Sequence, residues 1–377
     1  MNNKVTIKEI NSKTDYNTFV MFPFELYRGN PYWVPPIINE EIETIDPIIN
    51  PVYQNADARF YLAYREDKIV GRIAAMVNWI EVNELNKRKV RFGWYDAIDD
   101  VRVSKLLMDQ VIAFGKEHKL EFIEGPVGFS NLDKAGLLIE GFEERNTMIT
   151  LYNAPYYQKH LESLDFSIQA KWVEYEIKIS NFENSPEKIK RFSSVILDRY
   201  NLKILHFKKR KDILPYVDQM FKLLGETYNN LQTYVPIQDY QVQHYRDRYL
   251  KFIKPDFIKC VVDKNERLIA FAITMPSFTK ALQKINGKIN FFNFYHLLKA
   301  MMFNNRASFY LIGVHPDFQN KGITAIIFNE IQKLFNKRKI TIVETNPELE
   351  ENLAIQKLWK NYENRQHKKR ATFTKTI

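Results

Sequence analysis

Residues Ser308 to Phe335 have the sequence SFYLIGVHPDFQNKGITAIIFNEIQKLF. Ser308–Val314 has the length and apolar content of a buried strand. The following Pro316 ends that strand, because proline cannot donate a hydrogen bond to a sheet ladder. From Gly322 onward apolar residues recur at helical spacing. The stretch therefore predicts a strand, a short polar turn and an amphipathic helix.

The turn between this strand and this helix has the chemistry of an anion site. Its residues are Gln319, Asn320, Lys321, Gly322, Ile323 and Thr324. A helix N-terminus has unpaired backbone N–H groups and the positive end of the helix dipole, which suits a phosphate or pyrophosphate. The alternative interpretation is an ordinary strand–helix turn with a glycine near the helix start.

The same turn resembles the CoA loop of the acyl-CoA N-acyltransferase superfamily, the GNAT fold. The signature of that loop is [R/Q]-x-x-G-x-[G/A], and Gln319 and Gly322 match it. Thr324 stands where the family usually has glycine or alanine. The resemblance implies that Gln319–Thr324 hold the pyrophosphate of acetyl-CoA or another acyl-CoA.

Composition narrows the class of protein. The 377 residues favour two or three domains, and 45% hydrophobic content provides for real cores. No stretch reaches the roughly 18 apolar residues of a membrane span, and the N-terminal residues lack the apolar part of a signal peptide. A cytoplasmic location is therefore expected. The single cysteine, Cys260, argues against an intrachain disulfide and a cysteine-based zinc site, so no metal is expected.

The net charge of +10 indicates an anionic partner: CoA, acidic lipid or nucleic acid. The basic clusters at Lys208–Lys211 and His367–Arg370 are short, and either suits a solvated surface. Nucleic acid is therefore not the main expectation.

The chain predicts one order of elements twice: a hairpin, a third strand, a helix and a fourth strand. In the first half these are Phe60–Tyr64, Ile69–Met76, Val90–Ile98, Val101–His118 and Glu121–Glu124. In the second half they are Phe257–Val262, Leu268–Met275, Ser308–Val314, Gly322–Lys337 and Thr341–Glu344. This is the central order of the GNAT fold, and the helix crossover makes the last two strands parallel.

We therefore expect an α/β (α+β) protein of two GNAT-like units, residues 1–170 and 171–377. Each unit has a mixed, mostly antiparallel sheet, flanking helices and a splayed parallel strand pair. Further elements expected in the second unit are Trp172–Ile179, a helix Pro186–Tyr200 with Ser185 as its N-cap, Leu202–Lys208, Ile213–Asn229, a helix Leu349–Tyr362 and a final edge strand Lys368–Lys375. The basic residues of that last strand either protect the edge or meet the adenosine phosphate of CoA.

The two units differ at the turn that matters for CoA. The first unit has Asp99-Asp100-Val101-Arg102 there, with no glycine. Aspartate is a good helix cap, but it fills the anion site with negative charge. We therefore predict that the first unit does not bind CoA in the usual place.

Three other segments of the first half, Asn30–Pro36, Gly71–Ala75 and Gly125–Ser130, resemble an uncharacterised bacterial group of GNAT-like proteins. That resemblance implies a fold but no substrate. The glycine-rich Gly125–Ser130 shapes either a ligand pocket or only a turn.

Acyl transfer from a thioester to an amine requires positioning, proton removal and oxyanion stabilisation. By the family pattern, the backbone N–H of Val314 polarises the thioester, and the pantetheine arm runs between Ser308–Val314 and Thr341–Glu344. Glu344 is the candidate general base, with an exposed strand end as the alternative. Asn346 is a candidate to orient CoA or the acceptor. Tyr362 is the candidate general acid, with ordinary packing as the alternative.

The acceptor, a small-molecule or peptide amine, is expected to meet the insertion Pro276–Ala307, and Tyr228 and Tyr234 are further candidates to line its site. Three functions stay open. The first is an acyl-CoA-dependent N-acyltransferase active in the C-terminal unit. The second is a catalytically inactive tandem scaffold or binding module, which Thr324 favours. The third is an aminoacyl-tRNA-dependent transferase, supported only by the basic charge. The sequence makes no prediction of oligomeric state.

Overall fold

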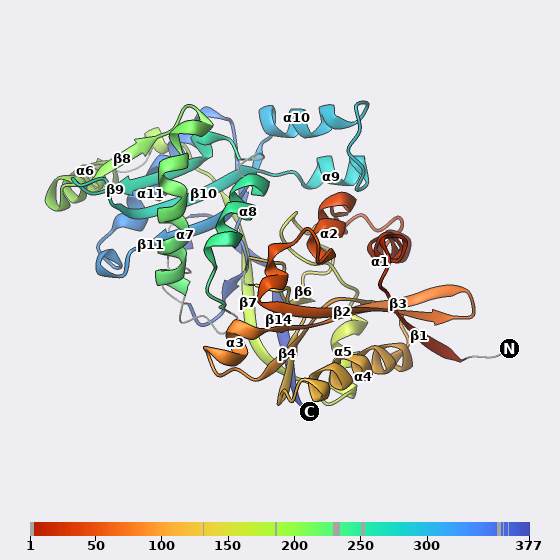
Figure 1. Ribbon diagram of the computed structural model, residues 1–377. Coiled ribbons are helices and arrows are strands. Elements are labelled where there is room, and N and C mark those ends of the chain that lie inside the picture. Colours follow the sequence, from red (N-terminus) through yellow and green to blue (C-terminus); the bar gives the residue numbers. More distant parts are fainter. Residues whose placement is uncertain are drawn as a thin grey trace. The chain divides into compact units, whose positions relative to one another are not determined.

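The computed structural model describes residues 4–130, 132–184, 187–228, 234–249, 253–352, 356, 358–360 and 362–377 (Figure 1). The chain forms two compact units. Unit 1 comprises Met1–Val173, Phe278–Leu298 and His367–Ile377, and unit 2 comprises Glu174–Ser277 and Lys299–Gln366. The first change of unit falls at Val173, whereas residues 278–298 and 367–377 of the C-terminal half pack with unit 1.

The strands of unit 1 are β1 (Val5–Glu9), β2 (Ala56–Arg65), β3 (Lys68–Asn78), β4 (Lys89–Ala97), β5 (Phe122–Gly125) and β6 (Leu137–Glu140). Its helices are α1 (Lys13–Leu26), α2 (Ile38–Ile45), α3 (Trp79–Asn83), α4 (Val101–Glu117), α5 (Tyr156–Ser163) and α9 (Thr279–Ile285). Three elements have residues in both units: β7 (Ser167–Lys178), α10 (Phe294–Met302) and β14 (Asn364–Thr376).

The remaining strands belong to unit 2 and are β8 (Lys203–His206), β9 (Ile258–Val262), β10 (Leu268–Pro276), β11 (Arg306–Val314), β12 (Ile342–Glu344) and β13 (Glu348–Leu349). Its helices are α6 (Glu187–Tyr200), α7 (Leu214–Tyr228), α8 (Asp239–Tyr249) and α11 (Ile323–Lys337). Ser185, Pro186 and Asn229, which the sequence assigns to helices, lie outside the described residues, as does part of the predicted helix Leu349–Tyr362.

The sheet of unit 1 is buried on both faces. Its strand order is β1-β2-β3-β4-β5-β14, and only β4 and β5 are parallel. Successive residues of β2 alternate between two cores, because side chains along a strand point to opposite faces. Tyr61 and Ala63 join the core under α4, whereas Phe60 and Leu62 join the core under α1.

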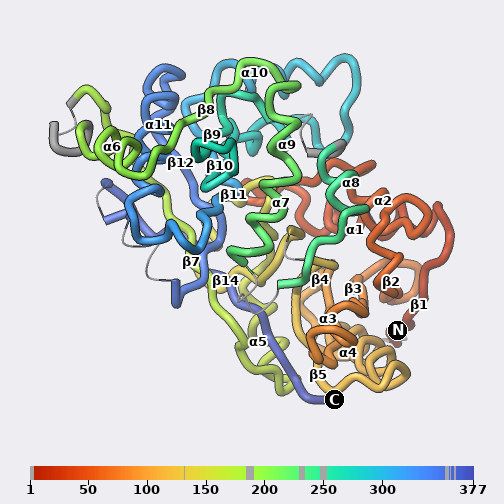
Figure 2. The backbone as a smooth tube through the Cα atoms, turned by 60° about the vertical axis from the view of Figure 1, so that its left-hand side comes forward, coloured from red at the N-terminus to blue at the C-terminus, as the bar shows by residue number. Residues whose placement is uncertain are grey.

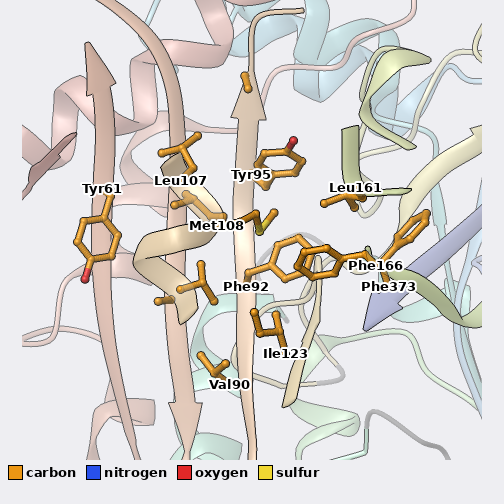
Figure 3. Close-up of a cluster of buried hydrophobic side chains, with 14 of the residues drawn as sticks. Tyr61, Val90, Phe92, Tyr95, Leu107, Met108, Ile123, Leu161, Phe166 and Phe373 are labelled. Carbon is orange, nitrogen blue, oxygen red and sulfur yellow. The ribbon is translucent and has the colours of Figure 1, made fainter. Parts of the chain in front are cut away.

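The last strand, β14, is not an exposed edge of unit 2, so that prediction was wrong. Its residues 369–376 pair with β6 and β5 of unit 1, and Figure 2 shows it (blue) beside α5. Phe373 joins the unit 1 core with Phe92 and Phe166 (Figure 3). Lys368 and Arg370 are buried, and they donate to the carbonyls of Arg145 and Leu151. These two cations therefore support the fold of unit 1.

Unit 2 repeats the arrangement with the strand order β7-β12-β11-β10-β9-β8. Again one pair is parallel, β11 with β12, and the other pairs are antiparallel. The apolar stripe of α11 and Ile196 of α6 cover one face of the sheet. Leu223 of α7 packs close to Gly313 of β11 on the other. Two sets of strands in this order, each with one parallel pair after the hairpin, confirm the predicted fold class.

Cys260 lies buried in β9, where burial raises the pKa of its thiol above the ordinary value. Among the described residues, no helix is long and apolar enough to cross a bilayer.

Candidate functional site

The candidate site lies in unit 2, where the parallel strands β11 and β12 part. Their pairing ends at Ser308 and Glu344, although β11 continues to Val314. Along this free edge the carbonyls of β11 accept hydrogen bonds from side chains. The donors are Asn346 Nδ2 to Tyr310, Tyr228 Oη to Ile312 (2.8 Å) and Gln319 Nε2 to Val314 (3.2 Å). Sequence-predicted Val314, Gln319 and Asn346 thus meet on one strand edge.

The N–H of Val314 lies on this free edge. The next residue, His315, donates its backbone N–H to Ile269 on the β10 side at 2.8 Å. Because backbone N–H groups alternate between the two edges of a strand, the N–H of Val314 points away from β10. It has the orientation that the sequence analysis requires of an oxyanion donor.

Glu348 is a functional candidate that the sequence analysis missed. Both of its carboxylate oxygens accept from Trp359 Nε1, at 3.0 and 3.1 Å. Burial raises the pKa of Glu348 from 4.5 to about 8, against the opposing effect of the indole hydrogen bond. A carboxyl group that titrates near neutral pH suits proton transfer.

Tyr228, at the end of α7, places its hydroxyl group on the same strand edge, where it donates to Ile312. Burial raises the pKa of Tyr228 to about 12, with a smaller contribution from the charge of Glu348. The phenol therefore stays protonated at neutral pH and can donate a proton beside Ile312 of β11.

Tyr362, the predicted general acid, packs in an apolar cluster with Ile177, Phe328 and Trp359. Burial raises its pKa above the ordinary value. No side-chain hydrogen bond of the Tyr362 hydroxyl is found among the described residues. Tyr234 is likewise buried, beside Gly225 of α7.

Asn346 holds the strands where their ladder ends. Its Nδ2 donates to Tyr310 of β11, and its Oδ1 is buried without a hydrogen-bond partner among the described residues. A buried amide oxygen without a partner loses hydration free energy, so it is a natural acceptor for a ligand N–H. This fits the predicted role of Asn346 towards CoA or the acceptor.

Glu344, the predicted general base, is buried at the end of β12 in an ion-pair network. Its carboxylate lies 3.3 Å from Arg306, which also binds Glu176 of β7. Arg365 donates to the same Glu176 at 3.0 Å. Despite burial, the hydrogen bonds from Arg306 and Arg365 lower the pKa of Glu176. Glu344 is therefore paired with Arg306 of the neighbouring strand β11.

The predicted phosphate loop joins β11 to α11. Gly322 is the N-cap of α11, and no side-chain cap of this helix end is found among the described residues. Gly322 and Asn320 both have left-handed backbone conformations, with φ of 82° and 59°. The ammonium group of Lys321 lies over the rings of Tyr200 and Phe318, at 5.4 and 5.3 Å. The backbone N–H groups of the first helical turn therefore have no side-chain acceptor at the cap.

Gly322 is needed by the protein itself as well as by any ligand. A Cβ atom here would lie 2.4 Å from Ile196 and 3.0 Å from Phe192, both in α6. The left-handed φ also disfavours any other residue. A bulky substitution of Gly322 would therefore disturb the packing of α6, which makes it a poor test of ligand binding.

The matching helix start of unit 1 is occupied by Asp100. Its carboxylate caps α4 by accepting from the N–H of Arg102 at 3.0 Å. It also pairs with the guanidinium groups of Arg102 (2.8 Å) and Arg65 (2.5 Å). These hydrogen bonds hold the pKa of Asp100 below its ordinary value. Neighbouring Asp99 lies 3.1 Å from His160.

The gap between the parallel strands of unit 1 is filled by the chain itself. The N–H of Val127 donates to Phe92 of β4 at 2.9 Å. A Cβ atom at Gly93 would lie 2.4 Å from the carbonyl of Val127. The turn that follows β5 thus pairs with β4 at the position that corresponds to the edge of β11 beyond Ser308 in unit 2. For Gly125–Ser130 this geometry favours the turn interpretation over the pocket.

The insertion Pro276–Ala307 does not remain with unit 2. Gly287 accepts from the backbone N–H of Ile38 at 2.9 Å, and Gln283 donates to the carbonyls of Pro31 and Trp33 at 2.9 Å. Its residues 278–298 therefore pack as part of unit 1. Tyr228, rather than this insertion, supplies the aromatic group at the strand edge.

No family model matches the chain. Two curated proteins are similar to it along most of their length. Protein YghO of Escherichia coli (strain K12) is 24% identical over 350 residues, which cover 91% of this chain and 88% of YghO. A bacterial ceramide synthase of Caulobacter vibrioides is 22% identical over 331 residues, which cover 84% of this chain and 82% of the synthase.

Among solved structures, a tandem GNAT protein from the clavulanic acid biosynthesis pathway has a TM-score of 0.55 at 8% identity, over 99% of this chain and 98% of its own. A GCN5-related glucosamine N-acetyltransferase region of a fungal multi-domain enzyme has a TM-score of 0.59 at 10% identity. The match covers all of this chain but only 38% of the fungal chain. The chain therefore has the fold of a tandem GNAT protein.

Proposed function

We propose that unit 2 is an acyl-CoA-dependent N-acyltransferase that transfers an acyl group to an amine. The observation that carries this proposal is the edge of β11 beyond Ser308, where its pairing with β12 has ended. This edge leads directly into the start of α11 at Gly322. The thioester of an acyl-CoA needs a strand edge with backbone hydrogen-bonding groups, and its pyrophosphate needs a helix start. In this chain the helix start directly follows the strand edge. The tandem GNAT fold supports the reaction class.

In this mechanism the pantetheine arm lies along β11, and the pyrophosphate binds the N–H groups of Asn320, Gly322, Ile323 and Thr324. The N–H groups of Gln319 and Lys321 donate to the carbonyls of Pro316 and Phe318, so these two residues only shape the loop. The N–H of Val314 stabilises the oxyanion as the amine nitrogen attacks the thioester carbonyl. Glu348 accepts the proton that the amine loses. The C–S bond then breaks, and Tyr228 protonates the leaving thiolate. Glu344 and Tyr362 stay as the alternative base and acid.

The similarity to a bacterial ceramide synthase suggests which amine to test first. Ceramide is an N-acylated long-chain amino alcohol, so a long-chain amine is our first candidate acceptor. A short amine and a peptide amine are the comparison acceptors in the same assay.

The CoA site can be tested by placing a charge on α11 without harming the helix. Thr324 is the second helical residue of α11, and an acidic side chain there stabilises the helix dipole but repels phosphate. We expect Thr324→Glu to weaken acetyl-CoA binding at least about tenfold in calorimetry. Thr14 has the same position in α1 of unit 1, so Thr14→Glu is the matched control.

If wild type and both variants bind acetyl-CoA with equal affinity, the CoA site does not lie at the start of α11. If wild type binds no acetyl-CoA at high micromolar concentration, the inactive scaffold replaces the enzyme as the proposed function.

The base can be identified by comparing Glu348→Gln with Glu344→Gln. We expect Glu348→Gln to lower kcat about 100-fold or more while acetyl-CoA affinity stays unchanged, because a proton acceptor is lost. In wild type, kcat/KM should rise with pH up to about 8, since Glu348 must be ionised to act. A loss confined to Glu344→Gln would assign the role to Glu344 instead.

A further inference from the structure

A segment of unit 1 presents large apolar side chains to solvent. Between Ile289 and Leu298 the exposed residues are Ile289, Phe291, Phe292, Phe294, Tyr295 and Leu298. Phe291 and Phe292 are 92% and 86% exposed. Folded proteins rarely leave two adjacent phenylalanines almost fully in water, because each ring loses favourable burial energy there. We call residues Ile289–Leu298 the aromatic segment.

The aromatic segment is held in a defined turn. Asn290 Oδ1 accepts from the backbone N–H groups of Phe292 (3.0 Å) and Asn293 (3.1 Å). In return, Asn293 Oδ1 accepts from the N–H of Asn290 at 2.8 Å, and its Nδ2 donates to Lys288 at 2.6 Å. The two phenylalanine rings contact each other edge to face, with centroids 5.9 Å apart. The turn thus holds both phenylalanine rings in positions exposed to solvent.

The base of the segment is anchored in unit 1. Gly287 packs against Phe24 with a left-handed φ of 77°, and its carbonyl binds Ile38. The preceding helix α9 buries Ala281, Leu282 and Ile285. The exposed aromatic side chains are therefore carried by a well-packed base.

The charged side chains within the aromatic segment and directly beside it in sequence are all lysines. Four exposed lysines lie in or beside it: Lys280, Lys284, Lys288 and Lys299. None of the four makes an ion pair with another described residue. The sequence has no aspartate or glutamate between Glu266 and Asp317. A partner that matches this surface must be both apolar and negatively charged.

We propose that the aromatic segment docks unit 1 on the surface of an anionic lipid bilayer. Phenylalanine and tyrosine rings insert at the level of the headgroups, and the lysines bind the negatively charged lipids. A second copy of this chain would bring the same four lysines into opposition, so charge complementarity favours the lipid. The inference is independent of the catalytic site in unit 2.

Vesicle co-sedimentation of the full chain tests this surface. The probe is vesicles of phosphatidylcholine and phosphatidylglycerol at a 3:1 ratio, compared with pure phosphatidylcholine. We expect wild type to bind the anionic vesicles and Phe291→Ser/Phe292→Ser to bind about tenfold less, because two rings no longer insert. Lys284→Gln/Lys288→Gln should bind about tenfold less at low salt, with a smaller difference at high salt.

The matched control is Ile48→Ser/Ile49→Ser, which removes two exposed apolar side chains elsewhere in unit 1. It should bind the anionic vesicles as wild type does. The proposal fails if wild type does not sediment with them, or if Phe291→Ser/Phe292→Ser binds equally well. It also fails if gel filtration shows a wild-type dimer that Phe291→Ser/Phe292→Ser disperses, because the surface would then bind a second copy.

Discussion

At the residue scale, the chemistry of the candidate site depends on burial that sequence patterns do not reveal. Glu344 was predictable as a carboxylate at the end of an expected strand. Glu348 follows only four residues later, but its raised pKa results from tertiary burial, which outweighs the opposing effect of the hydrogen bond from the indole of Trp359. The sequence could therefore predict the strand edge and Val314, but not the carboxyl group with the most perturbed pKa.

The indole of Trp359 should tune the pH dependence of the reaction. Its hydrogen bond lowers the pKa of Glu348, so Trp359→Phe should raise that pKa further. We expect the rising limb of the kcat/KM–pH profile to move to higher pH by about half a unit or more. Trp79→Phe in unit 1 removes an exposed indole hydrogen bond and is the control. An unchanged profile for Trp359→Phe would remove Glu348 from the proton-transfer step.

The ionisation of Glu348 should also appear in stability. Its pKa in the folded protein is about 8, above the ordinary value of 4.5, so folding favours the protonated carboxyl. The stabilisation that this group provides is complete below pH 4.5 and is lost as the pH rises through about 8. Glu348→Gln stays neutral, so it should unfold like wild type at pH 5 but be more stable by about 1–3 kcal/mol at pH 9. Urea unfolding at both pH values measures this, and a difference independent of pH would contradict it.

At the element scale, the same strand–turn–helix is built twice with opposite electrostatics. The helices α4 and α11 were predictable because their apolar residues recur at helical spacing, and their observed bounds agree closely with those expected. The capping aspartate of α4 was also recognisable from local sequence, because Asp100 directly precedes the helical pattern. The pairing of β14 was not, because a strand near residue 370 carries no local signal of which sheet it joins.

The cap of α4 gives a testable difference between two substitutions. Asp100→Ala loses both the cap and the contacts with Arg65 and Arg102, so it should destabilise the protein by about 1–2 kcal/mol. Asp100→Asn keeps a capping oxygen and should lose less. The pKa of Asp100 is lowered on folding, so the advantage of wild type over Asp100→Asn should be complete at pH 7 and begin to shrink as the pH falls below 3.8. It is lost only as the pH falls through the lowered pKa of the folded state, so at pH 3 it should be reduced. Urea titrations at pH 7 and pH 3 provide the comparison.

At the scale of the whole molecule, the sequence predicted two units of the same fold and a change of unit close to Val173. It did not predict that residues 278–298 and 367–377 return to unit 1. Local patterns specify helices and strands, whereas the choice of unit depends on contacts between residues that are far apart in sequence. The pairing of Phe373 with Gly125 is one such contact.

Removal of residues 367–377 should therefore destabilise unit 1 rather than unit 2. The deletion takes away the buried side chains of Arg370 and Phe373, the partner strand of β6 and one of the two partner strands of β5. We expect the free energy of unfolding of unit 1 to fall by more than about 4 kcal/mol, by comparison with single large-to-small core substitutions. Amide hydrogen exchange can follow both units separately, and deletion of the more exposed β1 is the control. Greater loss of protection in unit 2 would contradict this expectation.

The return of β14 to the first half also has a consequence for biosynthesis. A ribosome makes residues 1–173 first, but the sheet of unit 1 lacks a strand until residues 369–376 have emerged. Unit 2 is therefore synthesised, and can fold, before unit 1 is complete. Until then the core residues Phe92 and Phe166 lack their contact with Phe373. Nascent chains of this protein should accordingly depend on chaperones that shield apolar surface until translation is complete.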